Sequence, residues 1–276
     1  MTKLISMLLI MMSFVYGSWV DSALKDKDFI PSDSLNWHVA YFGVEVSDYV
    51  YEDGLRKLDD FMPENGFDLL QKIDVSDVIL VNNQLVIVDV QAEIYKKELT
   101  LEDGKKNLIV IAFRGTEPNE DIFTDIDAKL TSFREDEVLK LSKAMVHKGF
   151  LGSVLAFEKE LESGVKRYIT DGNSIVFLVG HSLGGSLATI YAAKLYDEGK
   201  KGKDILVYTY GAAGFANSTF VDEFKNKFYF HRIHNKDDIV VRATDIYARL
   251  SRGYQFPDGG HGCEEDYMPR VKAMAK

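Results

Sequence analysis

A serine, an aspartate and a histidine are the residues of this chain best suited to chemistry. Ser182 lies in the sequence Gly180-His181-Ser182-Leu183-Gly184, after a run of branched apolar residues and before an alanine-rich stretch. A Gly-x-Ser-x-Gly pattern in that setting is typical of a tight strand-to-helix turn that presents a nucleophilic serine. A serine hydroxyl reacts only when a base takes its proton, and an acid must orient that base.

The surroundings of Ser182 support this interpretation more than the short pattern does. Residues 175–179 predict a buried strand, and residues 186–195 predict a helix. Glycines flank the serine because a side chain would collide in so tight a turn. The amino end of the helix adds partial positive charge where an oxyanion would form.

The base is selected by chain order. In this kind of turn the order is serine, then acid, then histidine. Three of the six histidines precede the serine and are excluded: His38, His147 and His181. His231 and His234 belong to a predicted strand ahead of the best acid candidates. His261, in the glycine-rich loop 257–262, is therefore the predicted base.

The acid is expected at the carboxyl end of a parallel strand, where active-site loops gather. The strand that ends at His234 is followed by Asp237 and Asp238, and we assign the acid to Asp238. Asp237 is the close alternative, although an aspartate after a strand is often only a turn residue. Asp245 and Asp258 are the remaining alternatives.

Ester or amide hydrolysis also needs two donors for the developing oxyanion. The backbone N–H of Leu183, directly after the serine, is one predicted donor. The second should come from a loop after an earlier strand, and Arg114-Gly115-Thr116 follows the apolar run 107–113. Thr116 could donate both its N–H and its hydroxyl.

The elements that must position these residues alternate between strand and helix. Predicted helices cover 35–51, 133–145, 153–169, 186–195 and 218–227. Predicted strands cover 78–81, 85–90, 107–113, 175–179, 204–211 and 228–234, with the first two joined as a hairpin through Asn82-Asn83. This order predicts an α/β fold: a mostly parallel central sheet with helices on both faces, and antiparallel strands near the N-terminus.

Composition limits the domain organisation and the partners. The 276 residues are 46% hydrophobic and carry a net charge of −10, which argues against nucleic acid and anionic membranes. Lys3, an apolar run over 4–16 and Gly17-Ser18 predict a signal peptide over 1–17, hence secretion, with one domain over 18–276. The run is short for a stable membrane span, and an N-terminal helix of the mature protein is the alternative. The single Cys263 excludes an internal disulfide.

Several ordered blocks resemble the fungal-type (class 3) lipases, a branch of the α/β hydrolase superfamily. The likeness covers about residues 37–276. The blocks are Phe113-Arg114-Gly115-Thr116 with Asp125, Val146 to Phe150, Gly180 to Gly185, Thr209-Tyr210-Gly211, Asp238-Ile239-Val240, and His261 with Tyr267. Their joint order and spacing carry the resemblance.

The resemblance implies a short acidic lid over Glu117–Phe123. Ile122 and Phe123 would be its apolar elements, and Asp125 would anchor the loop. An ordinary surface loop is the alternative. The chain also departs from the family, which usually has a proline and an arginine at the positions of Ala213 and Gly214, and a proline at Val241.

The sequence therefore predicts a secreted serine hydrolase that cleaves acyl esters of lipids through an acyl-enzyme. A lipid or ester is the expected partner, in solution or at a lipid–water interface. No metal or organic cofactor is expected, because no cluster has zinc-ligand spacing and no phosphate-binding loop occurs. A phospholipase A, a feruloyl-type esterase and an inactive hydrolase fold used for binding are the alternatives.

Overall fold

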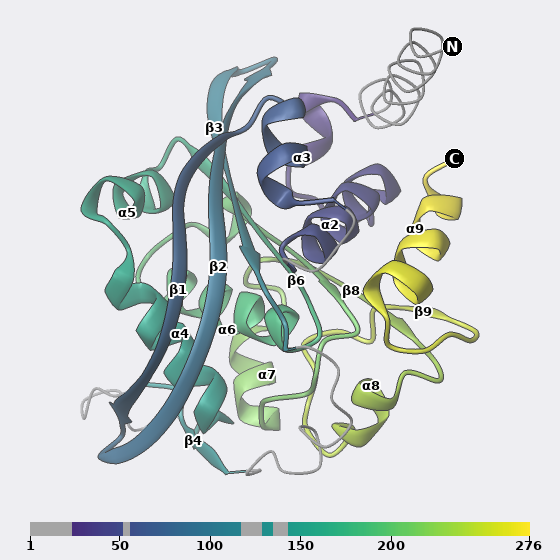
Figure 1. Cartoon of the computed structure of the whole chain (residues 1–276). Helices are drawn as coiled ribbons and strands as arrows, with labels where there is room; N and C mark the ends of the chain where they lie inside the picture. The colour runs from purple at the N-terminus through teal and green to yellow at the C-terminus, as the bar shows by residue number, and fades with distance from the viewer. Residues whose placement is uncertain (1–23, 52–55, 117–128, 135–142) are drawn as a thin grey trace, which may run out of the picture.

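A seven-stranded sheet organises the part of the chain that the computed structural model describes, residues 24–51, 56–116, 129–134 and 143–276 (Figure 1). Its strands are, in spatial order, β1 (Asp68–Val81), β2 (Gln84–Leu101), β3 (Gly104–Phe113), β6 (Ser174–His181), β7 (Ile205–Tyr210), β8 (Tyr229–Asn235) and β9 (Tyr254–Phe256). The strands β1, β2 and β3 pair antiparallel, and β3, β6, β7, β8 and β9 pair parallel. The predicted sheet is confirmed.

Helices cover both faces of this sheet, as predicted. In the described residues they are α2 (Trp37–Tyr49), α3 (Leu58–Glu64), α4 (Lys148–Glu160), α5 (Ser163–Thr170), α6 (Leu183–Asp197), α7 (Ser218–Phe224), α8 (Ile239–Ala243) and α9 (Met268–Met274). Short helical turns add η1 (Asp26–Phe29), η3 (Gly202–Asp204) and η4 (Cys263–Tyr267). In Figure 1, α2, α3 and α9 lie on one side of the sheet, and α4 and α6 on the other.

Alternation along the central strands divides the core into two layers. Ile109, Ile111 and Phe113 of β3 join the cluster on the α4 and α6 side, whereas Leu108 and Val110 join the cluster on the α2 side. The period of two follows from strand geometry, since successive side chains point to opposite faces. The central strands are apolar on both faces because helices cover both.

The early hairpin is confirmed and is longer than predicted. β1 and β2 pair continuously to the turn, with Val81 opposite Gln84. Asn82 and Asn83 take positive φ angles of 46° and 63°, as a two-residue turn of the I′ type requires. The sequence analysis missed the outer parts of both strands because polar residues there interrupt the apolar pattern.

The predicted helix over 133–145 is wrong at both of its described ends, because residues 133–134 and 143–144 are not helical. Met145 begins β5 (Met145–His147), which pairs antiparallel with β4 (Leu130–Ser132). Its backbone N–H donates to Asn217 Oδ1 at 3.0 Å, a long-range contact that local periodicity cannot reveal. Residues 135–142 lie outside the described part of the chain.

The single helix predicted over 153–169 is two helices. α4 starts at Lys148, where the His147 side chain accepts from Phe150 N, and the chain breaks at Leu161 before α5. Leu161 and Glu162 have extended backbone angles, so one helix cannot continue. The helix predicted over 218–227 ends at Phe224, and neither β9 nor α9 was predicted.

The predicted signal peptide, residues 1–17, lies outside the described residues, so its cleavage and the secretion of the chain stay predictions. Among the described residues, no helix has the length and apolar character needed to cross a membrane.

Candidate active site

Ser182 lies in the turn between β6 and α6 with a strained backbone. Its φ is 56° and its ψ is −128°, a conformation that side chains rarely adopt. Its N–H donates to the carbonyl oxygen of Tyr210 on β7 at 3.0 Å, which ties the turn to the neighbouring strand. The sharp turn expected from the Gly-x-Ser-x-Gly pattern is therefore present.

The two flanking glycines are required by close backbone approach. A Cβ atom on Gly184 would overlap the carbonyl oxygen of Phe113, and one on Gly180 would overlap the backbone of Gly184. Both obstacles are main chain, so no rotamer change could relieve them. β3, β6 and the start of α6 meet here too closely for any other residue.

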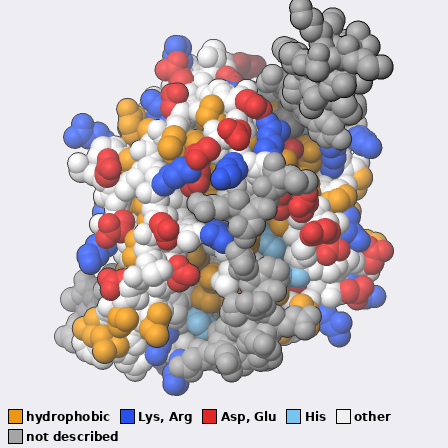
Figure 2. All heavy atoms as spheres, in the orientation of Figure 1, with side chains coloured by type: hydrophobic (Ala, Val, Ile, Leu, Met, Phe, Trp, Pro, Cys, Tyr) orange, Lys and Arg blue, Asp and Glu red, His pale blue; other side chains and the backbone are white. Residues whose placement is uncertain are grey.

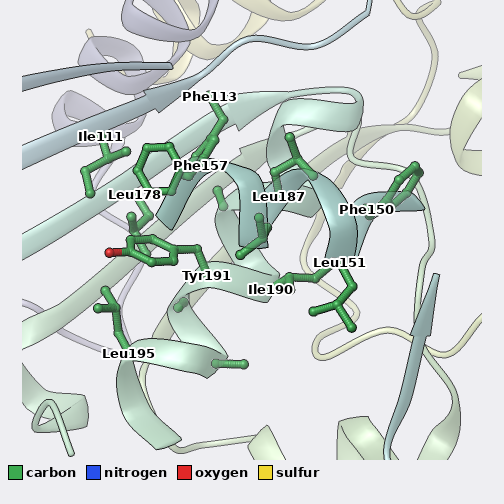
Figure 3. Close-up of a cluster of buried hydrophobic side chains, with 14 of the residues drawn as sticks. Ile111, Phe113, Phe150, Leu151, Phe157, Leu178, Leu187, Ile190, Tyr191 and Leu195 are labelled. Atoms are coloured by element: carbon green, nitrogen blue, oxygen red, sulfur yellow. The ribbon is translucent and has the colours of Figure 1, made fainter. Parts of the chain in front are cut away.

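The helix behind the serine is fixed by the core. Leu187, Ile190 and Tyr191 of α6 are buried in the cluster beneath the sheet. Figure 3 shows Tyr191 beside Phe157, and their ring centroids are 5.0 Å apart. Phe113, the last residue of β3, packs on Phe157 at 4.8 Å. The elbow thus rests on a packed aromatic layer that limits its movement.

The three residues selected from the sequence meet at the carboxyl ends of the parallel strands. His261 Nε2 is 2.9 Å from Ser182 Oγ. His261 Nδ1 lies 2.9 Å and 3.0 Å from the two carboxylate oxygens of Asp238. With Nδ1–H donating to the carboxylate, Nε2 is left to accept the serine proton.

Asp238 is buried and surrounded by donors. It precedes α8, and its Oδ1 accepts from the N–H groups of Val240 at 2.8 Å and Val241 at 3.1 Å. The hydroxyl of Tyr267 donates to Oδ2 at 2.6 Å. Burial alone would raise the pKa of Asp238, but hydrogen bonds from His261, Tyr267 and Val241 outweigh it and hold the pKa below its usual value.

The departure from the lipase pattern at Val241 has a structural counterpart. A proline there has no N–H, and the donation to Asp238 would be lost. The departure at Gly214 fits the backbone too: its N–H donates to Thr244 Oγ1 at 2.7 Å, and a Cβ would overlap the carbonyl oxygen of Thr244. This loop therefore has no room for a larger side chain at that position.

The loop that carries His261 is secured by side chains that accept from or donate to its backbone. Asn235 Nδ2 donates to the Gly260 carbonyl at 2.8 Å. Asp266 accepts from Gly260 N at 2.9 Å and from Gly262 N at 3.1 Å. Sequence reasoning missed these two supports, because a polar residue next to a glycine-rich loop gives no signal of which backbone group it meets.

His181 holds the same loop from inside. Its Nε2 lies 2.7 Å from the His261 carbonyl oxygen and must donate to it, so Nδ1 is free to accept from the Tyr51 hydroxyl at 3.3 Å. Burial and the neighbouring His261 lower the pKa of His181 to about 3. A neutral His181 therefore positions the His261 loop, and Tyr51 is a contributor that the sequence did not reveal.

The alternative histidines lie away from Ser182. His234 contacts Arg232 at 3.3 Å, and burial followed by the charge of Arg232 lowers the pKa of His234 to about 4. His231 faces the other end of β8, where its ring meets the Ser32 carbonyl at 2.9 Å. The hydroxyl of Ser182 is bonded to His261 and to neither of these two histidines.

The three alternative aspartates are exposed, and two of them form ion pairs with arginines. Asp237 points into solvent. Asp245 pairs with Arg249 at 3.2 Å, and Asp258 pairs with Arg270 at 3.1 Å. Of the four candidates, Asp238 is the one that contacts His261.

The predicted oxyanion donors flank the serine. Leu183 is the first residue of α6. On the other side, a Cβ on Gly115 would lie 3.3 Å from the Ser182 Cβ, so the loop after β3 runs beside the nucleophile. Thr116 follows as the last described residue of that loop, and its donor role stays a prediction. The predicted lid over 117–123, with Ile122 and Phe123, lies outside the described residues, as does Asp125.

Within the described residues, no group of three or more His, Cys, Asp or Glu side chains is arranged to hold a metal ion. Cys263 is buried and unpaired with another cysteine. The polar side chains that connect to Ser182 Oγ are His261, then Asp238, then Tyr267.

The chain has relatives among known proteins. A family model described as "Lipase (class 3)" matches residues 110–247, half of the chain. The lipase of Rhizopus niveus is 28% identical over 144 residues, which cover 51% of this chain and 36% of the relative. The chain thus aligns with about a third of the length of the curated lipases it matches.

Solved structures share the fold. Lipase II from Rhizopus niveus gives a TM-score of 0.54 with 22% identity, covering 74% of this chain and 72% of that one. The triacylglyceride lipase of Rhizomucor miehei gives 0.54 with 21% identity, covering 73% and 71%. At such identities the similarity establishes the α/β hydrolase architecture.

Proposed function

We propose, from the premise that this chain belongs to the class 3 lipase family, that it is a serine carboxylester hydrolase that cleaves acyl esters of lipids. One observation carries the proposal: the unbroken relay from Ser182 Oγ through His261 to Asp238, with each step at 2.9 Å. A buried carboxylate, a histidine and a serine so aligned are the arrangement that serine acyl transfer uses on several folds.

In this proposal, Ser182 Oγ attacks the ester carbonyl while His261 Nε2 takes its proton. His261 then gives the proton to the leaving alcohol, and an acyl-enzyme remains on Ser182. Water, deprotonated by His261, releases the acid in the same way. Asp238 orients the imidazole and stabilises its positive charge, helped by the donors that keep the carboxylate ionised.

The oxyanion of each tetrahedral intermediate would accept from the Leu183 N–H and from Thr116. The start of α6 adds its dipole to that position. Removing one oxyanion donor typically lowers turnover about 100- to 1000-fold. Thr116→Ala, which removes the hydroxyl but keeps the N–H, would separate the two contributions of that residue.

The lipid substrate class is supported by the relatives, which are named lipases. A phospholipase A or a feruloyl-type esterase would use the same relay. Acyl-chain profiling against triacylglycerols, phospholipids and short aryl esters distinguishes the three. We also propose that the chain acts outside the cytoplasm, as the predicted signal peptide implies.

The test is hydrolysis of a soluble short-chain ester by the wild-type chain, by Ser182→Ala and by Ser163→Ala. Ser163 is an exposed serine at the start of α5 and serves as the matched control. We expect Ser182→Ala to lose at least about 10,000-fold in kcat/KM, and Ser163→Ala to match the wild type. A folded wild-type chain that neither turns over esters nor reacts at Ser182 with a fluorophosphonate probe would favour the inactive binding protein.

A further inference from the structure

Four large apolar side chains are exposed together at the turn of the β1–β2 hairpin. They are Val78, Leu80, Leu85 and Ile87, exposed by 52%, 60%, 72% and 83%. Val78 pairs with Ile87 and Leu80 with Leu85, so all four occupy one face of the ribbon. Figure 2 shows hydrophobic side chains gathered at the lower left, where Figure 1 places this turn. We call these four residues the tip patch.

The strand register places the tip patch beyond the catalytic edge of the sheet. Ala92 of β2 pairs with Phe113 at the end of β3, and Phe113 pairs with Gly180, two residues before Ser182. The part of β2 from Gln91 back to Gln84 therefore extends past the level of the serine. At about 3.3 Å per residue, the turn projects some 20 Å beyond it, on the side where substrate must enter.

The same face of the ribbon is polar over the rest of the extension. Moving inward from the tip, the next pairs are Ser76 with Asp89 and Asp74 with Gln91. Lys72 follows and bonds to Asp59 and Glu93. A solvent-facing strand normally keeps this polar pattern, so four apolar residues confined to the tip are an exception that calls for a partner.

The tip patch is held on a firm base. On the opposite face of the ribbon, Val81, Val86 and Val88 are buried, and Gly152 of α4 lies directly beneath them. The Asn82 side chain donates to Thr131 Oγ1 at 2.8 Å. The hairpin is therefore tied to α4 and β4, and the exposed side chains are presented by an ordered element.

A second exposed apolar pair lies at the same edge. Ile239 in α8 and Ile246 just after it are exposed by 60% and 81%. Ile239 follows the proposed acid, Asp238, directly. In Figure 1, α8 and the hairpin turn lie on opposite sides of the lower, catalytic edge. Apolar groups thus flank the site on two sides.

We propose that the tip patch is a docking surface for an uncharged lipid–water interface, which it enters so that the catalytic edge faces the lipid. The proposal rests on the proposed function, because a lipid hydrolase must meet its substrate at such a surface. Four side chains on a rigid turn would enter the boundary between head groups and acyl chains, as amphipathic elements do. Ile239 and Ile246 would provide the second point of contact.

Charge and size favour an uncharged lipid surface over other occupants. The nearest residues on the patch face and at the turn are the uncharged or acidic Ser76, Asp89, Asn82 and Asn83. Lys148 of α4 reaches the turn from the opposite face, where its Nζ donates to Gln84 Oε1 at 3.2 Å. The chain carries a net charge of −10, so anionic lipids would repel it. A stable protein interface takes about 20 to 30 residues from each partner, far more than four.

The test measures co-sedimentation of the full chain with phosphatidylcholine vesicles. Every chain carries Ser182→Ala so that turnover does not change the lipid. The test variant is Leu80→Thr, Leu85→Thr and Ile87→Thr, since threonine keeps strand propensity while removing apolar surface. Leu69→Thr is the matched control: Leu69 is 45% exposed on the same strand, at its opposite end.

We expect the triple variant to bind on the order of 1000-fold more weakly, since burial of each of the three side chains is worth roughly tenfold. Leu69→Thr should bind like the parent, and replacing 30% of the lipid with phosphatidylserine should weaken binding. Equal binding of triple variant and parent, or no binding by the parent, would overturn the proposal. So would a dimer of the parent, measured by light scattering, that the triple variant loses.

The two proposals fail separately. With Ser182 restored, the triple variant should hydrolyse a soluble short-chain ester at the wild-type rate. Vesicle binding without ester hydrolysis by the wild-type chain would reject the hydrolase and keep the docking surface. Hydrolysis of the soluble ester by the wild-type chain, together with equal vesicle binding by the triple variant and its parent, would keep the hydrolase and reject the docking surface.

Discussion

The loops around Ser182 and the turn of the β1–β2 hairpin lie at the same edge of the sheet but are built in opposite ways. Around the serine, the side chains of Asp238 and His181 are buried and that of His261 is partly buried, and they bond to one another or to Tyr267 and the main chain. In the tip patch beside the hairpin turn, the four side chains are apolar and exposed.

The difference indicates what each region requires. Proton transfer between Ser182 and His261 depends on positions fixed to a fraction of an ångström, so the site needs close packing and complete hydrogen bonding. Contact with a fluid surface needs only apolar area at the right edge. We therefore expect substitutions near the serine to change catalysis strongly, and substitutions at the tip to leave chemistry untouched.

Among substitutions that leave the three residues of the relay in place, the largest effect is expected from Gly184→Ala. Its methyl group would overlap the Phe113 carbonyl, so the elbow must shift and carry the Leu183 N–H with it. Turnover of a soluble ester should fall about 100- to 1000-fold, and the free energy of unfolding by about 1–3 kcal/mol. Gly164→Ala in α5, where a methyl group meets open space, is the control and should not be destabilised.

His181→Phe should have the next largest effect. Phenylalanine keeps an aromatic ring at this position but cannot donate to the His261 carbonyl, so the loop that carries His261 becomes less firmly held. We expect kcat to fall roughly 10- to 100-fold. Tyr51→Phe removes the hydrogen bond from the Tyr51 hydroxyl to His181 Nδ1 and should lower kcat less than His181→Phe does. A wild-type kcat in His181→Phe would show that the loop does not need this support.

The pH dependence of stability gives a second readout for His181. The folded chain keeps it neutral down to about pH 3, whereas the unfolded chain binds a proton below about 6.5. Its contribution to stability is therefore lost as pH falls from about 6.5 towards 3. Thermal unfolding should show that His181→Phe loses less stability than the wild type across this range.

Tyr267→Phe tests the support of the acid. The substitution removes the donor to Asp238 Oδ2 and raises the carboxyl pKa towards its usual value. Turnover should fall about tenfold. Because the pKa of Asp238 is lowered in the fold, the ionised carboxylate stabilises the fold above about pH 4, and this contribution is lost as pH falls further. The difference in stability between Tyr267→Phe and the wild type should therefore shrink below pH 4. Tyr196→Phe, away from the site, is the control.

The smallest effect is expected at the hairpin tip with a soluble substrate. Leu85→Thr removes an exposed side chain that contacts no part of the site. The rate on a soluble ester should change less than twofold, and the free energy of unfolding by less than about 0.5 kcal/mol. A larger loss of soluble activity would mean that the two regions are coupled, against the contrast drawn above.

Local patterns in the sequence predicted the sheet and its order of strands and helices. Apolar runs identified β3, β6 and β7, and the Asn82-Asn83 turn identified the hairpin. Local patterns failed where long-range contacts decide. Met145 pairs with Ser132 and bonds to Asn217, so a helix-like stretch ends as a strand.

The chain order of serine, acid and histidine narrowed the residues of the candidate relay in advance. That order selected His261 as the partner of Ser182, and the end of a parallel strand favoured Asp238 while Asp237, Asp245 and Asp258 stayed open. The contact between Asp238 and His261 decided among the four aspartates. Only the tertiary structure decided the distances within the relay, the roles of Tyr267, Asn235 and His181 as supports, and the exposure of the hairpin tip. These features depend on contacts between side chains that are far apart in the sequence, and local periodicity carries no information about such contacts.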